Sequence, residues 1–146
     1  MRSAAPEDMP RLLALMTEFY GESSTPLDAV RAADAFTALL ADDRLGHVWL
    51  IQAGRNDVGY VVITFSYSME FGGRNAFLDD LFVQAPFRGA GLGTAVVNEV
   101  RAFCVEQGVR ALQLETGPDN TTAHALYRRA GFTVTDRQLL TLVLAE

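Results

Sequence analysis

The sequence lacks lysine altogether and has one cysteine and two histidines among its 146 residues. One thiol cannot form an intramolecular disulfide, and His47 and His124 are too far apart in the chain to give a ligand spacing. We therefore expect no disulfide framework and no metal site, and the single cysteine favours a reducing compartment. Cys104 lies on the expected buried face of a helix, which favours a core thiol over a nucleophile.

Long apolar runs are also absent. No segment approaches the roughly 18 uninterrupted apolar residues of a membrane span. Residues 1–6 have no apolar core typical of a secretory signal. We expect no membrane partner and a cytoplasmic location.

Positive charge is scarce. Twelve arginines face eighteen acidic residues, for a net charge of −6, and the arginines are scattered along the chain. A protein that binds nucleic acid through phosphates needs a concentrated basic face, so we expect no nucleic-acid partner. The negative field favours encounter with a cationic substrate.

The apolar residues, 49% of the chain, are enough for one domain spanning residues 1–146. Apolar spacing and helix-end signals predict a helix over 8–20 and another that begins with Thr25 as N-cap and Pro26 as its first residue and continues to Leu40. The later helices are expected over 92–107 and 121–130. Strands are expected over 48–52, 58–67, 76–83 and 111–116, with one or two more within 133–144. This order predicts a mixed α/β domain.

A glycine-rich segment, Arg88-Gly89-Ala90-Gly91-Leu92-Gly93, lies between a predicted buried strand and the start of a helix. Main-chain N–H groups at such a junction can bind one anion together, and the helix dipole favours its charge. The segment therefore predicts a pyrophosphate cradle, to which Arg88 can add a charge-assisted hydrogen bond. A simple connecting turn is the alternative. No Gly-Lys-Ser/Thr follows, which excludes a P-loop, and Arg88 stands where a dinucleotide fingerprint needs its first glycine.

Here the sequence resembles the GNAT superfamily of N-acetyltransferases. Arg88, Gly91 and Gly93 match the pyrophosphate motif Arg/Gln-x-x-Gly-x-Gly/Ala. Upstream, Leu81-Phe82-Val83 is similar to the splayed strand whose backbone pairs with pantetheine. Downstream, the second signature of the family is matched by Asn120, Ala123, Leu126-Tyr127 and Gly131-Phe132.

The resemblance implies a central mixed, mostly antiparallel sheet of six to seven strands with about four helices, splayed at the acetyl-CoA strand pair. It implies acetyl-CoA as co-substrate, no metal, and direct transfer of the acetyl group to an amine in a ternary complex. Homodimers are common in the family. The cofactor-binding residues implied are Leu81, Phe82, Val83, Arg88, Gly89, Ala90, Gly91, Leu92, Gly93, Thr94, Asn120 and Tyr127.

The chemistry needs a base, because an amine is mostly protonated at neutral pH, and an acid for the departing thiolate. The resemblance assigns the acid to Tyr127; packing of an aromatic ring in the core is the alternative. For the base, Asp79, Asp80 and Glu115 compete. Strand alternation predicts that only one of Asp79 and Asp80 faces the cleft. We expect Asp80 to make a structural hydrogen bond.

The run Leu78-Asp79-Asp80-Leu81-Phe82-Val83 is similar to one in diamine and thialysine N-acetyltransferases, which places Asp79 on the substrate side. Aspartate replaces the glutamate of that run, and its shorter reach favours a water relay. Glu115 resembles an acidic position in ribosomal-protein N-terminal acetyltransferases, and a solvated carboxylate is the alternative.

The acceptor is left open by the sequence. Glu22, Tyr67 and Glu70 could bind a cationic amine or belong to ordinary solvated loops. We expect a small-molecule amine such as a polyamine or amino acid. A protein N-terminus is the alternative acceptor, and a non-catalytic acyl-CoA sensor is the alternative from another class. Because lysine is absent, acetylation of the protein's own lysine side chains is excluded.

Overall fold

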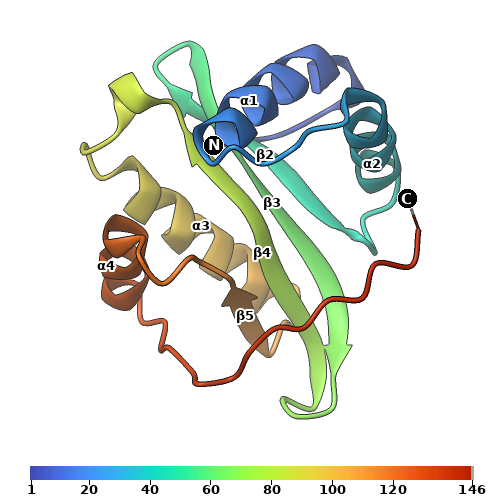
Figure 1. Ribbon diagram of the computed structural model, residues 1–146, viewed down its shortest axis with the longest axis vertical. Helices are drawn as coiled ribbons and strands as arrows, with labels where there is room; N and C mark the ends of the chain where they lie inside the picture. Colours follow the sequence, from blue (N-terminus) through green and yellow to red (C-terminus); the bar gives the residue numbers. More distant parts are fainter. Residues whose placement is uncertain (146) are drawn as a thin grey trace.

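The computed structural model describes residues 1–145, and within them it contains four α-helices and one five-stranded sheet (Figure 1). The strands are β1 (Arg2–Ser3), β2 (Gly46–Ala53), β3 (Asn56–Ser68), β4 (Gly73–Val83) and β5 (Ala111–Leu114). The helices are α1 (Met9–Glu22), α2 (Ala29–Ala41), α3 (Leu92–Glu106) and α4 (Thr121–Arg129), with 3-10 turns at Pro6–Asp8 and Ala85–Phe87. The predicted α/β class is confirmed. None of these helices is both long and apolar enough to cross a lipid bilayer.

The sheet follows chain order, β1-β2-β3-β4-β5, and is antiparallel except for the parallel β4–β5 pair. Because side chains alternate along a strand, each face of the sheet builds its own core. On one face Tyr60 and Val62 pack with Leu12 of α1 and Phe36 of α2. On the other face, Val61 and Ile63 of β3 pack in one cluster with Val96, Val100 and Cys104 of α3.

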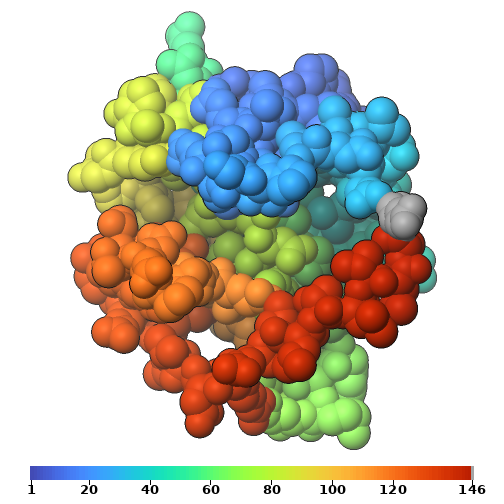
Figure 2. Space-filling model, viewed as in Figure 1, coloured from blue at the N-terminus to red at the C-terminus, as the bar shows by residue number. Residues whose placement is uncertain are grey.

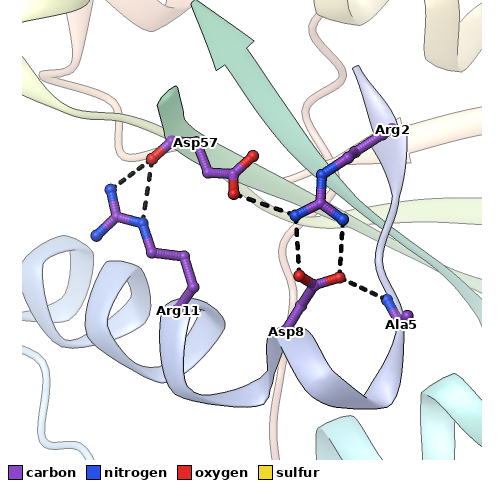
Figure 3. Close-up of polar contacts among 5 residues, drawn as sticks. All are labelled: Arg2, Ala5, Asp8, Arg11 and Asp57. Atoms are coloured by element: carbon purple, nitrogen blue, oxygen red, sulfur yellow. Dashed lines mark hydrogen bonds and ion pairs between the residues drawn. The ribbon is translucent and has the colours of Figure 1, made fainter. Parts of the chain in front are cut away.

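A polar cluster fixes the start of the chain to the β2–β3 hairpin (Figure 3). Arg2 of β1 donates two hydrogen bonds to the Asp8 carboxylate, at 2.9 and 2.8 Å, and a third to Asp57 at 3.1 Å. Arg11 of α1 donates to the main-chain oxygen of Asp57. The bonds from Arg2 lower the pKa of Asp8 below its ordinary value. The cluster thereby positions α1, whose far end reaches the candidate site.

The start of the second helix differs from the prediction. Asp28, rather than Thr25, is the N-cap: its carboxylate accepts from the N–H groups of Val30 and Arg31, both at 3.0 Å. Pro26 therefore lies outside the helix. The Asp28 carboxylate caps two N–H groups and so decides where the helix begins. Thr25 and Asp28 are both residue types that favour an N-cap.

The strand count also differs. The short strand β1 was not predicted, and it pairs with Trp49 and Leu50 of β2. The final strands expected within 133–144 are wrong for this structure, where the segment 133–145 contains neither helix nor strand. The two residues of β1 are too few for a periodic signal. The last segment has the apolar content of a strand but pairs with no strand of the described chain.

Candidate functional site

Strands β4 and β5, the last two strands of the sheet, pair over only part of the length of β4. Their pairing ends where Leu78 lies opposite Leu114, but β4 continues to Val83. Residues 80–83 remain paired with β3 and have no strand of the described chain on their other edge. The predicted splay is confirmed. An open edge of this kind offers main-chain groups to an extended ligand.

Phe82, in the middle of this open edge, contributes no side chain to it. Its ring is 3% exposed and stacks on Phe19 with centroids 5.3 Å apart. Any contact of Phe82 with a ligand along the edge therefore involves its backbone, as the sequence comparison with splayed strands implies.

The glycine-rich segment forms the junction between β4 and α3. Gly89 and Gly91 have φ values of +81° and +80°, in the left-handed region that other residues avoid. Gly91 is the N-cap, and its carbonyl accepts from Ala95, so the N–H groups of residues 92–94 precede the helical ladder. At Gly93 a Cβ would lie 3.3 Å from the Leu126 side chain of α4. The left-handed backbone at Gly89 and Gly91 favours glycine, and at Gly93 a side chain would make a tight contact with Leu126. The loop leaves main-chain donors at the helix start.

Arg88 is held against α1 in this structure. Its guanidinium donates to both oxygens of Glu22 at 2.8 Å, and its Nε donates to the carbonyl of Val83 at 2.7 Å. Arg88 and Glu22 are each 45% exposed, and a pair this exposed is weak and exchangeable. Arg88 can therefore leave Glu22 for a stronger polyanion at the adjacent loop.

A bulge in β4 brings Asp79 and Asp80 to the same side of the sheet. Val62 of β3 pairs with Asp80 and the next residue, Ile63, pairs with Leu78, so Asp79 is the extra residue. An inserted residue interrupts the alternation of side chains. The expectation that only one of the two carboxylates can face the cleft is therefore wrong.

Hydroxyl groups, and not arginines, surround these carboxylates. Asp80 accepts from the Tyr60 hydroxyl at 2.8 Å and from the Tyr20 hydroxyl at 3.5 Å. Asp79 is exposed and is bonded by Thr64. Within residues 1–145, neither carboxylate forms an ion pair with an arginine. The site thus holds two adjacent negative groups without a cation.

The environment shifts the acidity of these groups. Burial raises the pKa of Asp80 and of Asp79, while the bonds from Tyr60 and Thr64 act in the opposite direction. Burial, followed by the charge of Asp80, raises the pKa of Tyr20 to about 12. The expected structural hydrogen bond of Asp80 is present. Tyr20 and Tyr60 were missed as its partners, because nothing in the sequence pairs α1 with β3 and β4.

Tyr127 and Glu115 lie on a different part of the site. Both line a cavity of about 720 Å³ bordered by β5, α3, α4 and the segment 133–139, and Asp79 and Asp80 do not. Burial raises the pKa of Tyr127, whose ring packs edge-on against Phe132 at 5.6 Å. Glu115 is exposed and follows the last residue of β5.

Asn120 begins α4. Its side-chain oxygen accepts from the N–H of Ala123 at 3.1 Å, which makes it the N-cap of the helix that carries Tyr127. The capping bond explains the residue type in structural terms. Contact with a cofactor stays a prediction.

Two of the three residues considered for binding a cationic amine are paired with arginines. Glu22 is paired with Arg88, and Glu70 accepts two hydrogen bonds from Arg137 at 2.7 and 2.8 Å. Tyr67 is 73% exposed. Asp79 and Asp80 differ from Glu22 and Glu70 in that, within the described residues, no arginine pairs with them.

Cys104, on the inner face of α3, is buried in the core. Burial raises the pKa of its thiol to about 11. A neutral, enclosed thiol is a poor nucleophile, as the sequence indicated.

Known proteins are similar to this chain in sequence and in fold. Residues 9–132 match the acetyltransferase (GNAT) family. An aminoglycoside N(6')-acetyltransferase type 1 from Stenotrophomonas maltophilia is 28% identical over 141 residues, 94% of this chain and 88% of that protein. The thialysine N-epsilon-acetyltransferase of Bos taurus is 35% identical over 74 residues, 51% of this chain but 43% of that protein, so the match spans less than half of the relative.

Among solved structures, the integron cassette protein HFX_CASS3 from the mobile metagenome of Cole Harbour Salt Marsh superposes with a TM-score of 0.89. It is 44% identical in sequence, and the match covers 99% of this chain and 90% of that one. The family match covers most of the chain, including the splayed strands, the glycine-rich junction and α4. The protein is therefore an acyltransferase that belongs to the GNAT family of acetyltransferases.

Proposed function

We propose that this enzyme transfers the acetyl group of acetyl-CoA to a primary amine of a small molecule, by direct attack of the amine within a ternary complex. The observation that carries the proposal is the pair of adjacent carboxylates, Asp79 and Asp80, which lie on the open half of β4 without a cation. Two uncompensated negative groups favour a cationic amine over a neutral acceptor.

The chain's own groups fit acetyl-CoA. Residues 88–94 combine two left-handed glycines, the first N–H groups of α3 and an exchangeable arginine, a combination suited to a pyrophosphate. The open edge at Leu81, Phe82 and Val83 offers main-chain bonds to the pantetheine arm. When bound, acetyl-CoA supplies a thioester with a thiolate leaving group.

Two groups would handle protons. Tyr127 has a raised pKa, so its phenol keeps its proton at neutral pH and can donate it to a developing thiolate. Asp79 is exposed and has a raised pKa, which suits it to accept a proton from the amine, directly or through water. Asp80, bonded by two tyrosines, adds negative charge beside it. Glu115, which shares a cavity with Tyr127, is the alternative base through water.

The first experiment measures thiol release from acetyl-CoA with polyamines, amino acids, aminoglycosides and N-terminal peptides as acceptors, against a no-acceptor control. Release with one class of small amine supports the proposal. Release with peptides alone would assign the enzyme to protein N-termini. Binding of acetyl-CoA without release across the panel would contradict transfer and favour a sensor.

Substitution of Tyr127 and Asp79 tests the assignment. Tyr127→Phe should lower kcat by about 100-fold, the usual contribution of a general acid, and leave acetyl-CoA affinity nearly unchanged. Asp79→Asn should lower kcat and raise KM for the amine. Glu106→Gln, which removes an exposed carboxylate at the end of α3, is the matched control and should change neither. Wild-type turnover of the Tyr127 variant would exclude it as the acid.

A further inference from the structure

The last turns of α1 lie along the open half of β4. Phe19 stacks on Phe82 with ring centroids 5.3 Å apart, and the Tyr20 hydroxyl lies 3.5 Å from a carboxylate oxygen of Asp80. Figure 2 shows green atoms of the sheet in a hollow between α1, in blue, and the last segment of the chain, in orange and red. We call the α1 face of β4 around Asp79 and Asp80 the acceptor side.

The side chain of Arg88 reaches the acceptor side from the loop before α3, a helix that packs on the opposite face of the sheet. Its guanidinium carbon lies 5.5 Å from the centroid of the Phe82 ring. Both carboxylate oxygens of Glu22, the last residue of α1, accept from this guanidinium at 2.8 Å. Arg88 thus places a positive charge on the acceptor side and neutralises a carboxylate there.

Arg88 also occupies a main-chain acceptor of the open edge. The N–H of Gln84 donates to the carbonyl of Val58 at 2.8 Å, so Val83, one residue earlier, directs its N–H and C=O away from β3. The Nε of Arg88 donates to this Val83 carbonyl at 2.7 Å. A ligand along the edge would compete with Arg88 for the carbonyl, and an anion at the glycine-rich loop would compete with Glu22 for the guanidinium.

The ion pair between Arg88 and Glu22 is weak enough to be exchanged. Each side chain is 45% exposed, and exposed pairs contribute little to stability. A pyrophosphate at residues 88–94 would meet the first N–H groups of α3 as well as the guanidinium, and both favour an anion there. Of the salt bridges among the described residues, only the one with Arg88 includes Glu22. Departure of Arg88 would therefore leave Glu22 as an uncompensated carboxylate.

We propose that Glu22 binds the cationic acceptor and that Arg88 masks it until acetyl-CoA is bound. The inference rests on the function proposed above, because it takes acetyl-CoA at residues 88–94 and an amine beside Asp79 and Asp80. In the free enzyme Arg88 bridges Glu22 and the open edge. In the loaded enzyme Arg88 binds the pyrophosphate, and Glu22 joins the two aspartates as a third negative group. Because coupling between two sites is reciprocal, cofactor and acceptor then strengthen each other's binding.

Carboxyl footprinting tests the unmasking of Glu22 without an acceptor. A carbodiimide with glycine ethyl ester modifies accessible carboxylates, and mass spectrometry locates them. Because lysine is absent, trypsin cleaves after arginine alone, and Glu22 and Glu18 lie in one peptide, residues 12–31. Glu18 is exposed and accepts from the neutral Gln84 amide at 3.0 Å, which makes it the internal control.

Saturating coenzyme A should raise the modification of Glu22 by about fivefold, the scale of an exposed ion pair, and leave that of Glu18 unchanged. Pantetheine, which has no pyrophosphate, should change neither. Arg88→Gln sets the scale, because Glu22 should then be modified at the loaded level without any ligand. An unchanged or reduced modification of Glu22 in wild type with coenzyme A bound would overturn the proposal.

Calorimetry tests the role of Glu22 toward a cation. Spermidine, a polycation, is the probe, and coenzyme A replaces acetyl-CoA so that no transfer occurs. Coenzyme A should lower the spermidine dissociation constant by at least about fivefold in wild type, the low end of typical couplings. The factor should be smaller in Glu22→Gln and should keep its wild-type value in Glu18→Gln. The phosphates of coenzyme A attract spermidine in all three proteins, so the difference isolates Glu22.

Equal factors in the three proteins, or no binding of spermidine with coenzyme A present, would refute Glu22 as a cation-binding residue. Failure of the proposed function has another signature. If thiol release is absent with every acceptor while coenzyme A still unmasks Glu22, transfer is refuted and the coupling stands. If transfer occurs and the modification of Glu22 does not change, the coupling is refuted and transfer stands.

Discussion

Replacing Tyr60 with phenylalanine tests the reading of the buried carboxylate. The Tyr60 hydroxyl donates to Asp80 at 2.8 Å, and the Tyr60 side chain is fully buried. A hydrogen bond to a charged group contributes about 2 kcal/mol, whereas one between neutral groups contributes about 1 kcal/mol. We therefore expect the free energy of unfolding to fall by about 2 kcal/mol where Asp80 is ionised and by about 1 kcal/mol where it is protonated.

The sign of the pH dependence follows from the direction of the shift. Burial raises the pKa of Asp80 in the folded state above its ordinary value of 3.8. The folded state then binds the proton more tightly than the unfolded state, so this group stabilises most below the ordinary carboxyl pKa, and the contribution is lost as pH rises through the folded pKa. Tyr60→Phe removes a bond that lowers this pKa, so its destabilisation must grow with pH across the titration of Asp80.

The measurement is urea unfolding of wild type and Tyr60→Phe across the acidic to neutral range. The matched control is the same substitution in an Asp80→Asn background, where the carboxylate that accepts from Tyr60 is absent and the loss should be about 1 kcal/mol throughout. An equal loss for Tyr60→Phe at all pH values with Asp80 intact would show that the hydroxyl does not bond the ionised carboxylate.

Three further outcomes follow from the same structure. Glu22→Gln releases Arg88, so the dissociation constant for coenzyme A in calorimetry should fall by up to about fivefold, the scale of an exposed ion pair; weaker binding would contradict exchange. Gly91→Ala puts a side chain at φ +80° and should lower the free energy of unfolding in urea by about 1–2 kcal/mol. The control Gly21→Ala, within α1 and without close neighbours, should raise it by about 0.5–1 kcal/mol. Equal effects of the two substitutions would refute backbone strain at position 91. Cys104, with a pKa raised to about 11, should resist a thiol reagent at pH 8 until the protein unfolds, and rapid native labelling would contradict its burial.

Local signals were enough for several elements. The glycine pattern from Gly89 to Gly93 predicted a loop and helix start, and the structure places a left-handed N-cap at Gly91. Apolar spacing located all four helices, because a helix buries residues three and four apart. The start of α2 was misplaced because Thr25 and Asp28 are both good caps, and only the bonds to Val30 and Arg31 decide between them.

The site was predictable in part. Tyr127, Glu115 and the two aspartates were named from the sequence, but their grouping was not. Strand alternation treats β4 as regular, and a bulge leaves no mark in residue types, so the common orientation of Asp79 and Asp80 could not be foreseen. Their roles stay predictions for the experiments above.

The sequence by itself determined the α/β class, the loop before α3 and the residue types available for acid and base chemistry, because these depend on local periodicity and backbone freedom. The tertiary structure alone decided which distant groups meet. Tyr20 reaches Asp80 across 60 positions of sequence, Arg88 reaches Glu22 across 66, and within the described residues the outer edge of β5 has no partner strand. Contacts of this kind depend on how the helices pack on the sheet, and no short stretch of residues encodes that packing.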